Sequence, residues 1–156
     1  PLTLLVNQEN SFKVSAAQEV AYNLSTDDLT VTVEELPWEQ FTQRLTDGDF
    51  DLYYGECRLT ADWDVSALAG TNGSLNYGGY SNENTDALLA AALSNSSQRS
   101  EALTALWRDL LDNAPFLPVC FKSTSVLATE GVVEGLAPTE TNTFCHLDAW
   151  QIHLNP

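Results

Sequence analysis

The fold of this chain is decided by residues 45–59, which read LTDGDFDLYYGECRL. The segment joins the end of a predicted helix to an acidic turn at Gly48 and then to an apolar run that predicts a buried strand. Charged and polar residues follow this strand directly. In open α/β sheets, ligands bind beyond the carboxyl ends of the strands, so the segment indicates both a fold class and a place for a site.

The residues before this segment predict a repeated strand–helix pattern. Residues 2–6 form a short apolar run, and residues 29–34 alternate apolar and polar side chains, as a strand with one wetter face does. Between the two strands, apolar side chains recur with the spacing of a helix face at Ala17, Val20, Ala21 and Leu24. A second helix is expected to begin near Pro37. The side chains on one side of this helix are Trp38, Phe41 and Leu45.

The residues after the segment predict an irregular loop and two further helices. Residues 60–83 contain four glycines and no clear periodicity, and such long loops in compact domains are often functional. The first helix is predicted at residues 85–94, and residues 95–97 can cap the second. The second helix carries an apolar stripe made of Leu103, Leu106, Trp107 and Leu110. Residues 116–121 and 125–128 are predicted to be strands.

Length and composition indicate one globular domain. The chain has 156 residues, of which 44% are hydrophobic and 10% aromatic, enough for a real core. The order of elements favours an α/β domain with an at least partly parallel sheet, and we expect a single domain over residues 1–156. No apolar run is long enough to cross a bilayer. The chain begins at Pro1 and contains no Met, as expected of an excised or processed piece.

The chain is strongly acidic. Six basic residues face 22 acidic ones, which gives a formal net charge of −16. The basic residues are scattered, and nucleic-acid binding needs clustered Lys and Arg. Nucleic acid and anionic membrane surfaces are therefore poor candidates as partners. A soluble, secreted surface accounts for the acidity.

The three cysteines do not form a recognisable framework. Cys57, Cys120 and Cys145 show no C-x-x-C spacing, and an odd number cannot be a complete set of disulfides. Cys57 and Cys120 lie in apolar, strand-like runs, which favours buried thiols. A disulfide between these two strands is the alternative.

Motifs for metal binding are incomplete. Asp47, Asp49 and Asp51 alternate as calcium ligands do, but Leu52 and Arg58 stand where an EF-hand needs Gly and Glu. A solvated turn between helix and strand is therefore expected there.

Motifs for catalysis are incomplete as well. The two histidines, His146 and His153, have no further ligands at zinc-site spacing. No G-x-S-x-G elbow, Cys/His signature or phosphate-binding glycine motif is present. We predict no catalytic residue, no metal site and no cofactor. A small hydrolase built around His146 is the enzymatic alternative.

The candidate ligand-binding residues lie in the loop that follows the predicted strand. Arg58 can hold a carboxylate through two parallel hydrogen bonds, while Trp63 and Tyr77 offer flat apolar walls with a polar edge. The alternative is that the aromatic side chains fill the core of the domain itself. The predicted ligand-binding set is Arg58, Asp62, Trp63, Asp64, Asn76 and Tyr77.

Six short motifs follow one another in a characteristic order. They are LTLLVN at 2–7, PWEQF at 37–41, GDFDL at 48–52, NYGGY at 76–80, DALL at 86–89 and APFLPV at 114–119. In this order they resemble the later part of family 5 extracellular solute-binding proteins, the receptors that deliver peptides and some other solutes to ABC importers.

The resemblance implies the type II periplasmic-binding-protein fold, in which two α/β lobes close on a ligand. This chain is then most of the second, C-terminal lobe, with a mostly parallel sheet flanked by helices, and the N-terminal lobe of the same parent chain is missing. The isolated piece is expected to have half a cleft and to bind ligand weakly, if at all.

The function implied is the substrate-binding component of an ABC importer, with no cofactor. Its partners are a peptide or other small solute and an ABC permease complex. Its location is extracellular or periplasmic, as a cell-surface lipoprotein in a Gram-positive parent. The alternative is a domain for sensing or adhesion, without transport, that uses the same fold.

One departure from the family pattern concerns the ligand. Peptide-binding members typically carry an Asp shortly after a Gly-Trp pair, and this Asp pairs with the amino terminus of the peptide. Here Glu56 stands in place of the Trp, and Leu59 stands near the expected Asp. Two alternatives stay open: Asp62 or Asp64 holds the amine, or Arg58 favours an anionic end of the ligand.

Overall fold

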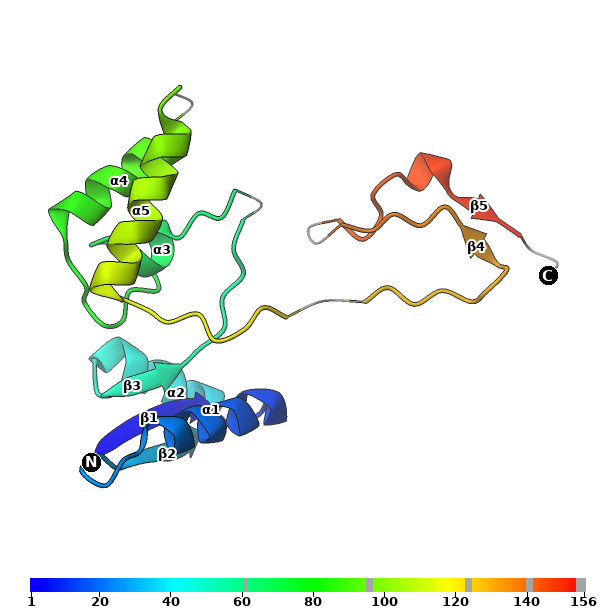
Figure 1. Ribbon diagram of the computed structural model, residues 1–156. Coiled ribbons are helices and arrows are strands. Elements are labelled where there is room, and N and C mark those ends of the chain that lie inside the picture. The colour runs from blue at the N-terminus through cyan, green and yellow to red at the C-terminus, as the bar shows by residue number, and fades with distance from the viewer. Residues whose placement is uncertain (61, 95–96, 123–124, 140–141, 154–156) are drawn as a thin grey trace. The chain divides into compact units, whose positions relative to one another are not determined.

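The computed structural model describes residues 1–60, 62–94, 97–122, 125–139 and 142–153 (Figure 1). The chain divides into two compact units, Pro1–Phe116 and Leu117–Pro156. The first unit contains a parallel sheet and five helices among its described residues. The second contains a short antiparallel hairpin.

The first unit is built on a three-stranded parallel sheet in the order β2-β1-β3. Its strands are β1 (Leu2–Asn7), β2 (Val31–Leu36) and β3 (Leu52–Tyr54). In the register, Leu4 of the central strand lies opposite Val33 on one side and Leu52 on the other. The β-α-β-α-β order and the parallel sheet predicted from the sequence are confirmed.

Two helices cover opposite faces of this sheet: α1 (Ser11–Leu24) and α2 (Trp38–Asp47). Leu4 and Val6 pack against the buried alanines of α1, Ala17 and Ala21. Leu5 points the other way and packs against Phe41 and Leu45 of α2. Because successive side chains of a strand alternate between faces, β1 contributes to both cores and is almost completely buried.

Individual residues explain how α2 ends and how the turn after it is held. Gly48 closes the helix with φ of 69°, in the left-handed region where glycine carries no steric penalty. In the acidic turn, an Asp49 carboxylate oxygen lies 2.6 Å from Nε of Arg44, and Asp51 accepts the Thr3 N–H at 2.8 Å. The predicted solvated turn is confirmed. Trp38 stays 60% exposed, although its ring lies 6.0 Å from that of Phe41.

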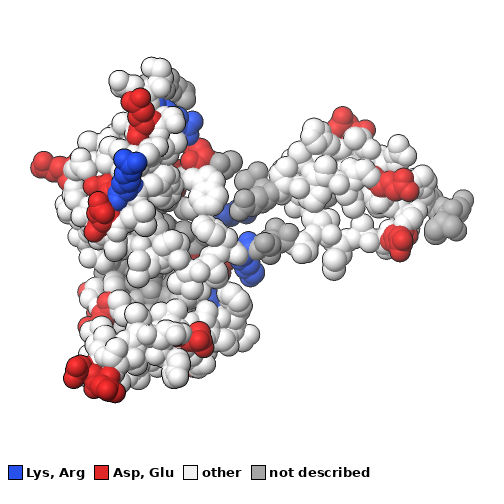
Figure 2. Space-filling model, viewed as in Figure 1, with Lys and Arg blue, Asp and Glu red and all other residues white. Residues whose placement is uncertain are grey.

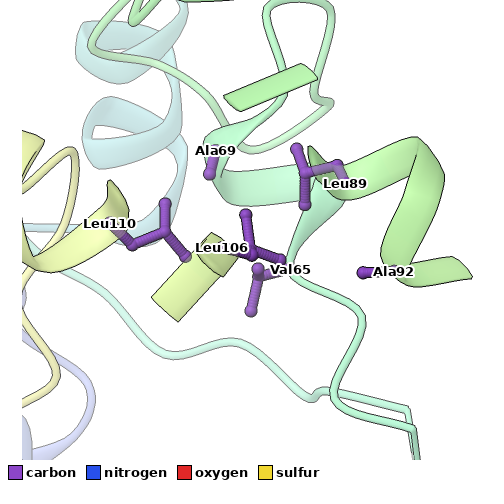
Figure 3. Packing of buried hydrophobic residues seen from close by; sticks show 6 residues of the cluster. All are labelled: Val65, Ala69, Leu89, Ala92, Leu106 and Leu110. Atoms are coloured by element: carbon purple, nitrogen blue, oxygen red, sulfur yellow. The ribbon is translucent and has the colours of Figure 1, made fainter. Parts of the chain in front are cut away.

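Three helices form a second layer of the first unit: α3 (Ser66–Ala69), α4 (Glu83–Leu93) and α5 (Arg99–Asn113). Helices α4 and α5 lie side by side (Figure 1). Their shared core is shown in Figure 3 and consists of Val65, Ala69, Leu89, Ala92, Leu106 and Leu110. The sequence predicted α4 and α5 but not α3, because four residues are too few for a periodic signal. Of the proposed cap at residues 95–97, residues 95 and 96 lie outside the described residues, and the cap position of α5 is Gln98 rather than Ser97.

The second unit has little regular structure. It contains β4 (Val133–Glu134), η1 (Leu147–Ala149) and β5 (Gln151–Ile152), and the two strands pair antiparallel. The strands predicted at 116–121 and 125–128 are wrong, because both segments are irregular. A strand needs a neighbour that satisfies its backbone N–H and C=O groups, and no described strand pairs with either segment.

The cysteine prediction is also wrong in one respect. Cys57 and Cys120 are both exposed and outside any strand, rather than buried thiols, and no disulfide joins the described cysteines. Within the described ranges, no helix combines the length and apolar character needed to span a membrane.

Candidate functional site

The candidate site is the carboxyl edge of the parallel sheet. The first crossover, through α1, leads from β1 to β2, and the second, through α2, leads back past β1 to β3. The two crossovers therefore run in opposite directions across the sheet. Ligands of open α/β sheets bind at such a switch point, beyond the ends of the strands. Here Asn7 ends β1, and Gly55 follows the last residue of β3.

A polar network joins the ends of β1 and β2. Asn7 is only 7% exposed, and its side-chain amide donates to the carboxylate of Glu9. The other Glu9 oxygen accepts the Trp38 N–H at 3.0 Å. This main-chain N–H is the largest cause of the lowered pKa of Glu9. Glu9 is therefore an ionised link between the β1–α1 connection and the first turn of α2.

An ion pair joins the ends of β1 and β3. Nζ of Lys13, in the first turn of α1, lies 3.0 Å from a carboxylate oxygen of Glu56, two residues after β3. The Lys13 side chain is 17% exposed and that of Glu56 is 51% exposed. Arg58 follows in the same segment, is exposed, and forms no ion pair with the part of the chain that the structure describes.

Three predicted site residues lie together just before α3, beside helices α4 and α5: Asp62, Trp63 and Asp64. A hydrogen bond from the Thr60 hydroxyl is the main cause of the lowered pKa of Asp62, with a weaker contribution from the Arg99 guanidinium 4.0 Å away. Trp63 has φ of 59° and is 46% exposed.

Asp64 already has local hydrogen-bond donors. It accepts the Ser66 N–H at 2.8 Å and the Ser66 hydroxyl, and so holds the first turn of α3. The hollow that Asp64 shares with Asp62 and Trp63 has a volume of about 10 Å³. That is room for about one water molecule, and no peptide side chain fits without rearrangement.

The last two predicted residues, Asn76 and Tyr77, belong to a tightly held loop. The Asn76 amide donates to the carbonyl oxygens of Gly70, at 3.0 Å, and Tyr80, at 2.7 Å. Its oxygen accepts the Tyr80 N–H at 2.9 Å. The nitrogen and the oxygen of this side-chain amide thus both form hydrogen bonds with main-chain groups of the loop. A Cβ at Gly73 would overlap the carbonyl oxygen of Ala67, so only glycine fits there.

Tyr77 connects this loop to the sheet. Its ring meets that of Tyr53 edge-on, with 6.0 Å between the centroids, and packs against the core on the α2 side. The Tyr53 hydroxyl donates to the Leu75 carbonyl oxygen at 3.4 Å. Burial is the main cause of the raised pKa of Tyr53. This packing matches the alternative in which aromatic residues fill the core, while the contact of Tyr77 with a ligand stays a prediction.

The structure thus distributes the six predicted residues over three places: Arg58 after β3, the Asp62–Asp64 group at α3, and the pair Asn76 and Tyr77 in the loop docked on Tyr53. Sequence reasoning missed Glu9, Lys13 and Glu56. A signal for them existed, because residues after the first and third predicted strands must meet at the same edge of a parallel sheet.

Acidic residues outnumber basic ones, at 22 to six. Figure 2 shows Asp and Glu side chains dispersed over the visible face, with few Lys and Arg among them. Of the six basic residues, Arg44 is paired with Glu34 and Asp49 beside α2, away from the β1–β3 edge. Lys13, which follows β1, and Arg58, which follows β3, are the basic residues closest in sequence to the carboxyl ends of these two strands.

No protein-family model and no curated protein matches this chain. Solved structures do. The pheromone receptor PrgZ, described with its mode of peptide binding, is 33% identical over 73% of this chain, with a TM-score of 0.62. The predicted resemblance to family 5 solute-binding proteins is confirmed.

The oligopeptide-binding protein AppA from Bacillus subtilis, solved with a nonapeptide, matches 97% of this chain with 18% identity and a TM-score of 0.68. The Escherichia coli murein tripeptide binding protein MppA matches 73% with 24% identity and a TM-score of 0.61. At these identities the two show the fold alone, which is that of a lobe of OppA-type solute-binding proteins.

This chain spans 22% of PrgZ, 31% of AppA and 23% of MppA, so it corresponds to a fraction of each family 5 protein. PrgZ is named as a receptor, which supports a non-enzymatic protein rather than a hydrolase.

Proposed function

We propose that this chain is most of the C-terminal lobe of a solute-binding protein that serves an ABC importer and binds peptides between two lobes. The similarity to PrgZ, at 33% identity over 73% of the chain, is the observation that carries the proposal. The parallel sheet supports it, because its carboxyl edge is where such folds bind ligands.

The partners in this proposal are a peptide or other small solute, an ABC permease complex and the N-terminal lobe of the same parent chain. The location is extracellular or periplasmic, with a lipid anchor in a Gram-positive parent. The strongly acidic composition suits a protein that stays soluble outside the cell and avoids nucleic acid.

Among the six predicted residues, Arg58 and Asp62 are the best candidates for direct ligand contact. Both are exposed, and Arg58 has no ion-pair partner in the described chain. Asp64 and Asn76 already bond to neighbouring groups, so their role in binding is expected to be indirect.

The test uses the two-lobe parent protein. Arg58→Ala and Asp62→Ala should each weaken peptide binding by about tenfold or more, since each removes a charged hydrogen-bonding group. Isothermal titration calorimetry measures the change. Arg108→Ala, at an exposed position on α5, is the matched control and should leave affinity unchanged. If neither Arg58→Ala nor Asp62→Ala changes affinity, the proposed site is wrong.

A second candidate function is sensing without transport. It is favoured by the similarity to PrgZ, which is named as a pheromone receptor. Genes for a permease and an ATPase beside the parent gene support the importer. If they are absent and the protein still binds a peptide, sensing is the better account.

A further inference from the structure

The loop of residues 71–80, which carries two of the predicted ligand-binding residues, is fastened at both ends to the first turn of α4. At its start, the Thr71 N–H donates to the Asp86 carboxylate at 2.9 Å. At its end, a hydrogen bond of 2.8 Å joins the hydroxyl groups of Tyr80 and Thr85. Because Thr85 and Asp86 are successive residues of α4, a single helical turn holds the whole loop.

The Thr85 hydroxyl also connects this attachment to α5. Thr85 is completely buried, and its hydroxyl donates to the Asp109 carboxylate at 2.5 Å. The other oxygen of Asp109 accepts an N–H of the Asn84 side chain at 2.8 Å. Both carboxylate oxygens are thus bound by side chains of α4, and the end of the loop is linked through Thr85 to a charged group on the neighbouring helix.

The chemistry of these groups sets the direction of the hydrogen bonds. An ionised carboxylate offers only acceptors, so the single hydrogen of the Thr85 hydroxyl is directed to Asp109. The Thr85 oxygen is then left with acceptor sites alone, and Tyr80 is the donor in the bond between the two hydroxyls. The hydrogen bonds therefore run from Tyr80 through Thr85 to Asp109, and bonds that end on a charge in this way strengthen one another.

We propose that Thr85 and Asp109 are positioning residues for peptide binding, which hold residues 71–80 through the Tyr80 hydroxyl in the conformation that binds the ligand. The proposal rests on the proposed function, because it concerns a loop that carries two of the proposed ligand-binding residues. Thr85 and Asp109 act on this loop rather than on the peptide itself. They raise the population of one loop conformation before the peptide arrives, which reduces the entropic cost of binding.

Contacts within the loop carry the effect from Tyr80 to the predicted ligand-binding residues. The Asn76 amide bonds to both the N–H and the carbonyl oxygen of Tyr80, so a movement of Tyr80 breaks two of its hydrogen bonds. Tyr77 lies between these two residues, and its ring packs against that of Tyr53 in β3. A change at Thr85 is therefore expected to alter the positions of Asn76 and Tyr77 through a continuous set of contacts.

The experiment uses the full-length receptor in five forms: the wild type, Thr85→Val, Thr85→Ser, Tyr80→Phe and Ser25→Ala. Thr85→Val removes the hydroxyl with little change of shape, whereas Thr85→Ser keeps it. Ser25→Ala is the matched control, because the Ser25 hydroxyl likewise accepts one hydrogen bond, from the Val31 N–H at 3.0 Å, and donates one, to the Ala21 carbonyl oxygen at 2.8 Å. Ser25 precedes β2 and so lies at the amino edge of the sheet.

Two quantities are measured for each form. Isothermal titration calorimetry gives the apparent Kd for a synthetic library of nonapeptides. Hydrogen exchange in the ligand-free protein gives the protection of the Tyr80 amide, which is bonded to the Asn76 side chain at 2.9 Å. The second measurement reports the loop itself, and it separates a change of loop conformation from the loss of a direct contact with the peptide.

Thr85→Val should raise Kd about tenfold, since the loss of one charge-assisted hydrogen bond changes the population of a conformation on that scale. Tyr80→Phe should raise it about threefold, because the bond it removes joins two neutral groups. Both variants should lose protection of the Tyr80 amide. Thr85→Ser should restore Kd and protection toward the wild-type values. Ser25→Ala should lower the stability of the protein but leave Kd and the exchange of the loop unchanged.

An unchanged Kd in Thr85→Val would overturn the positioning role and leave only a structural link between α4 and α5. An equal loss of affinity in Ser25→Ala would overturn it as well, because general destabilisation then explains both variants. If Thr85→Val fails to fold, Tyr80→Phe decides: a raised Kd with unchanged loop exchange means that Tyr80 contacts the peptide directly. If the wild type binds no peptide of the library, the proposed peptide function fails and the positioning role fails with it.

Discussion

The two units of this protein use apolar residues in opposite ways. Every buried hydrophobic residue of the described chain belongs to the first unit, where three clusters line the two faces of the sheet and the α3–α5 layer. In the second unit, large apolar side chains are exposed instead. These include Leu117, Val119, Phe121, Leu127, Phe144 and Ile152. An apolar run therefore becomes part of a core only where other elements supply a partner surface.

The difference has a physical basis in backbone pairing and size. In the first unit, β1 is hydrogen-bonded on both sides and its side chains are covered by helices on both faces. In the second, the paired strands span two residues each. A two-stranded hairpin is marginal in water, and a unit of about 40 residues buries too little surface to be stable alone.

The largest expected effect is seen when the units are produced separately. Residues 1–116 should unfold cooperatively, because the three clusters are complete within them. Residues 117–156 should show no cooperative transition. Circular dichroism during thermal unfolding measures both, with the whole chain as the reference. A cooperative transition in 117–156 would remove the distinction between the units.

A single leucine in each unit tests the same comparison at smaller scale. Leu5→Ala, at a fully buried position, should lower the free energy of unfolding by about 2–5 kcal/mol through lost burial and a cavity. Leu127→Ala, at a position 93% exposed, should change it by less than about 0.5 kcal/mol. Urea denaturation measures both variants. A large loss in Leu127→Ala would show that this residue is covered in solution.

Loop amides provide a third comparison. Asn76→Ala removes three hydrogen bonds inside the loop and should cost about 1–3 kcal/mol of stability, since main-chain groups are left unpaired. Asn142→Ala, in the second unit, removes an exposed bond to the Phe144 N–H and should cost much less. Urea denaturation measures the costs. Equal costs would contradict a special role for Asn76 in holding the loop.

The smallest expected effect is a pH dependence due to Glu9. Its pKa in the folded chain is lowered by the Trp38 N–H, relative to about 4.3 when unfolded. The ionised group therefore stabilises the fold above that value, and the contribution is lost as pH falls through the folded pKa. Glu9→Gln should lose stability at pH 7 but not at the acidic end of a series of urea titrations. Glu130→Gln, at an exposed position in the second unit, should show no such pH dependence.

The predictions from the sequence were more accurate for the first unit than for the second. The strands and the longer helices of the first unit have apolar spacings that match their period, and Gly48 ends α2 as its residue type suggests. The apolar runs at 116–121 and 125–128 have the composition of strands but no described pairing partner. Such a partner is a tertiary property that a local pattern does not contain.

The candidate site was predictable in position but not in its contacts. Residues after β3 were identified because ligands bind beyond the ends of parallel strands. The pairing of Lys13 with Glu56, and the commitment of the Asn76 amide to its own loop, depend on side-chain geometry. In the sequence alone, Lys13, Glu56 and Asn76 cannot be told apart from other polar residues.

The most direct test of the central claim, that this chain is part of a peptide-binding receptor, is to identify the natural ligand. The full-length protein is purified under native conditions and denatured, and the released small molecules are identified by mass spectrometry. We predict a mixture of peptides. A sugar or a metal chelate as the released ligand, or an empty protein that also fails to bind added peptides, would contradict peptide as the ligand.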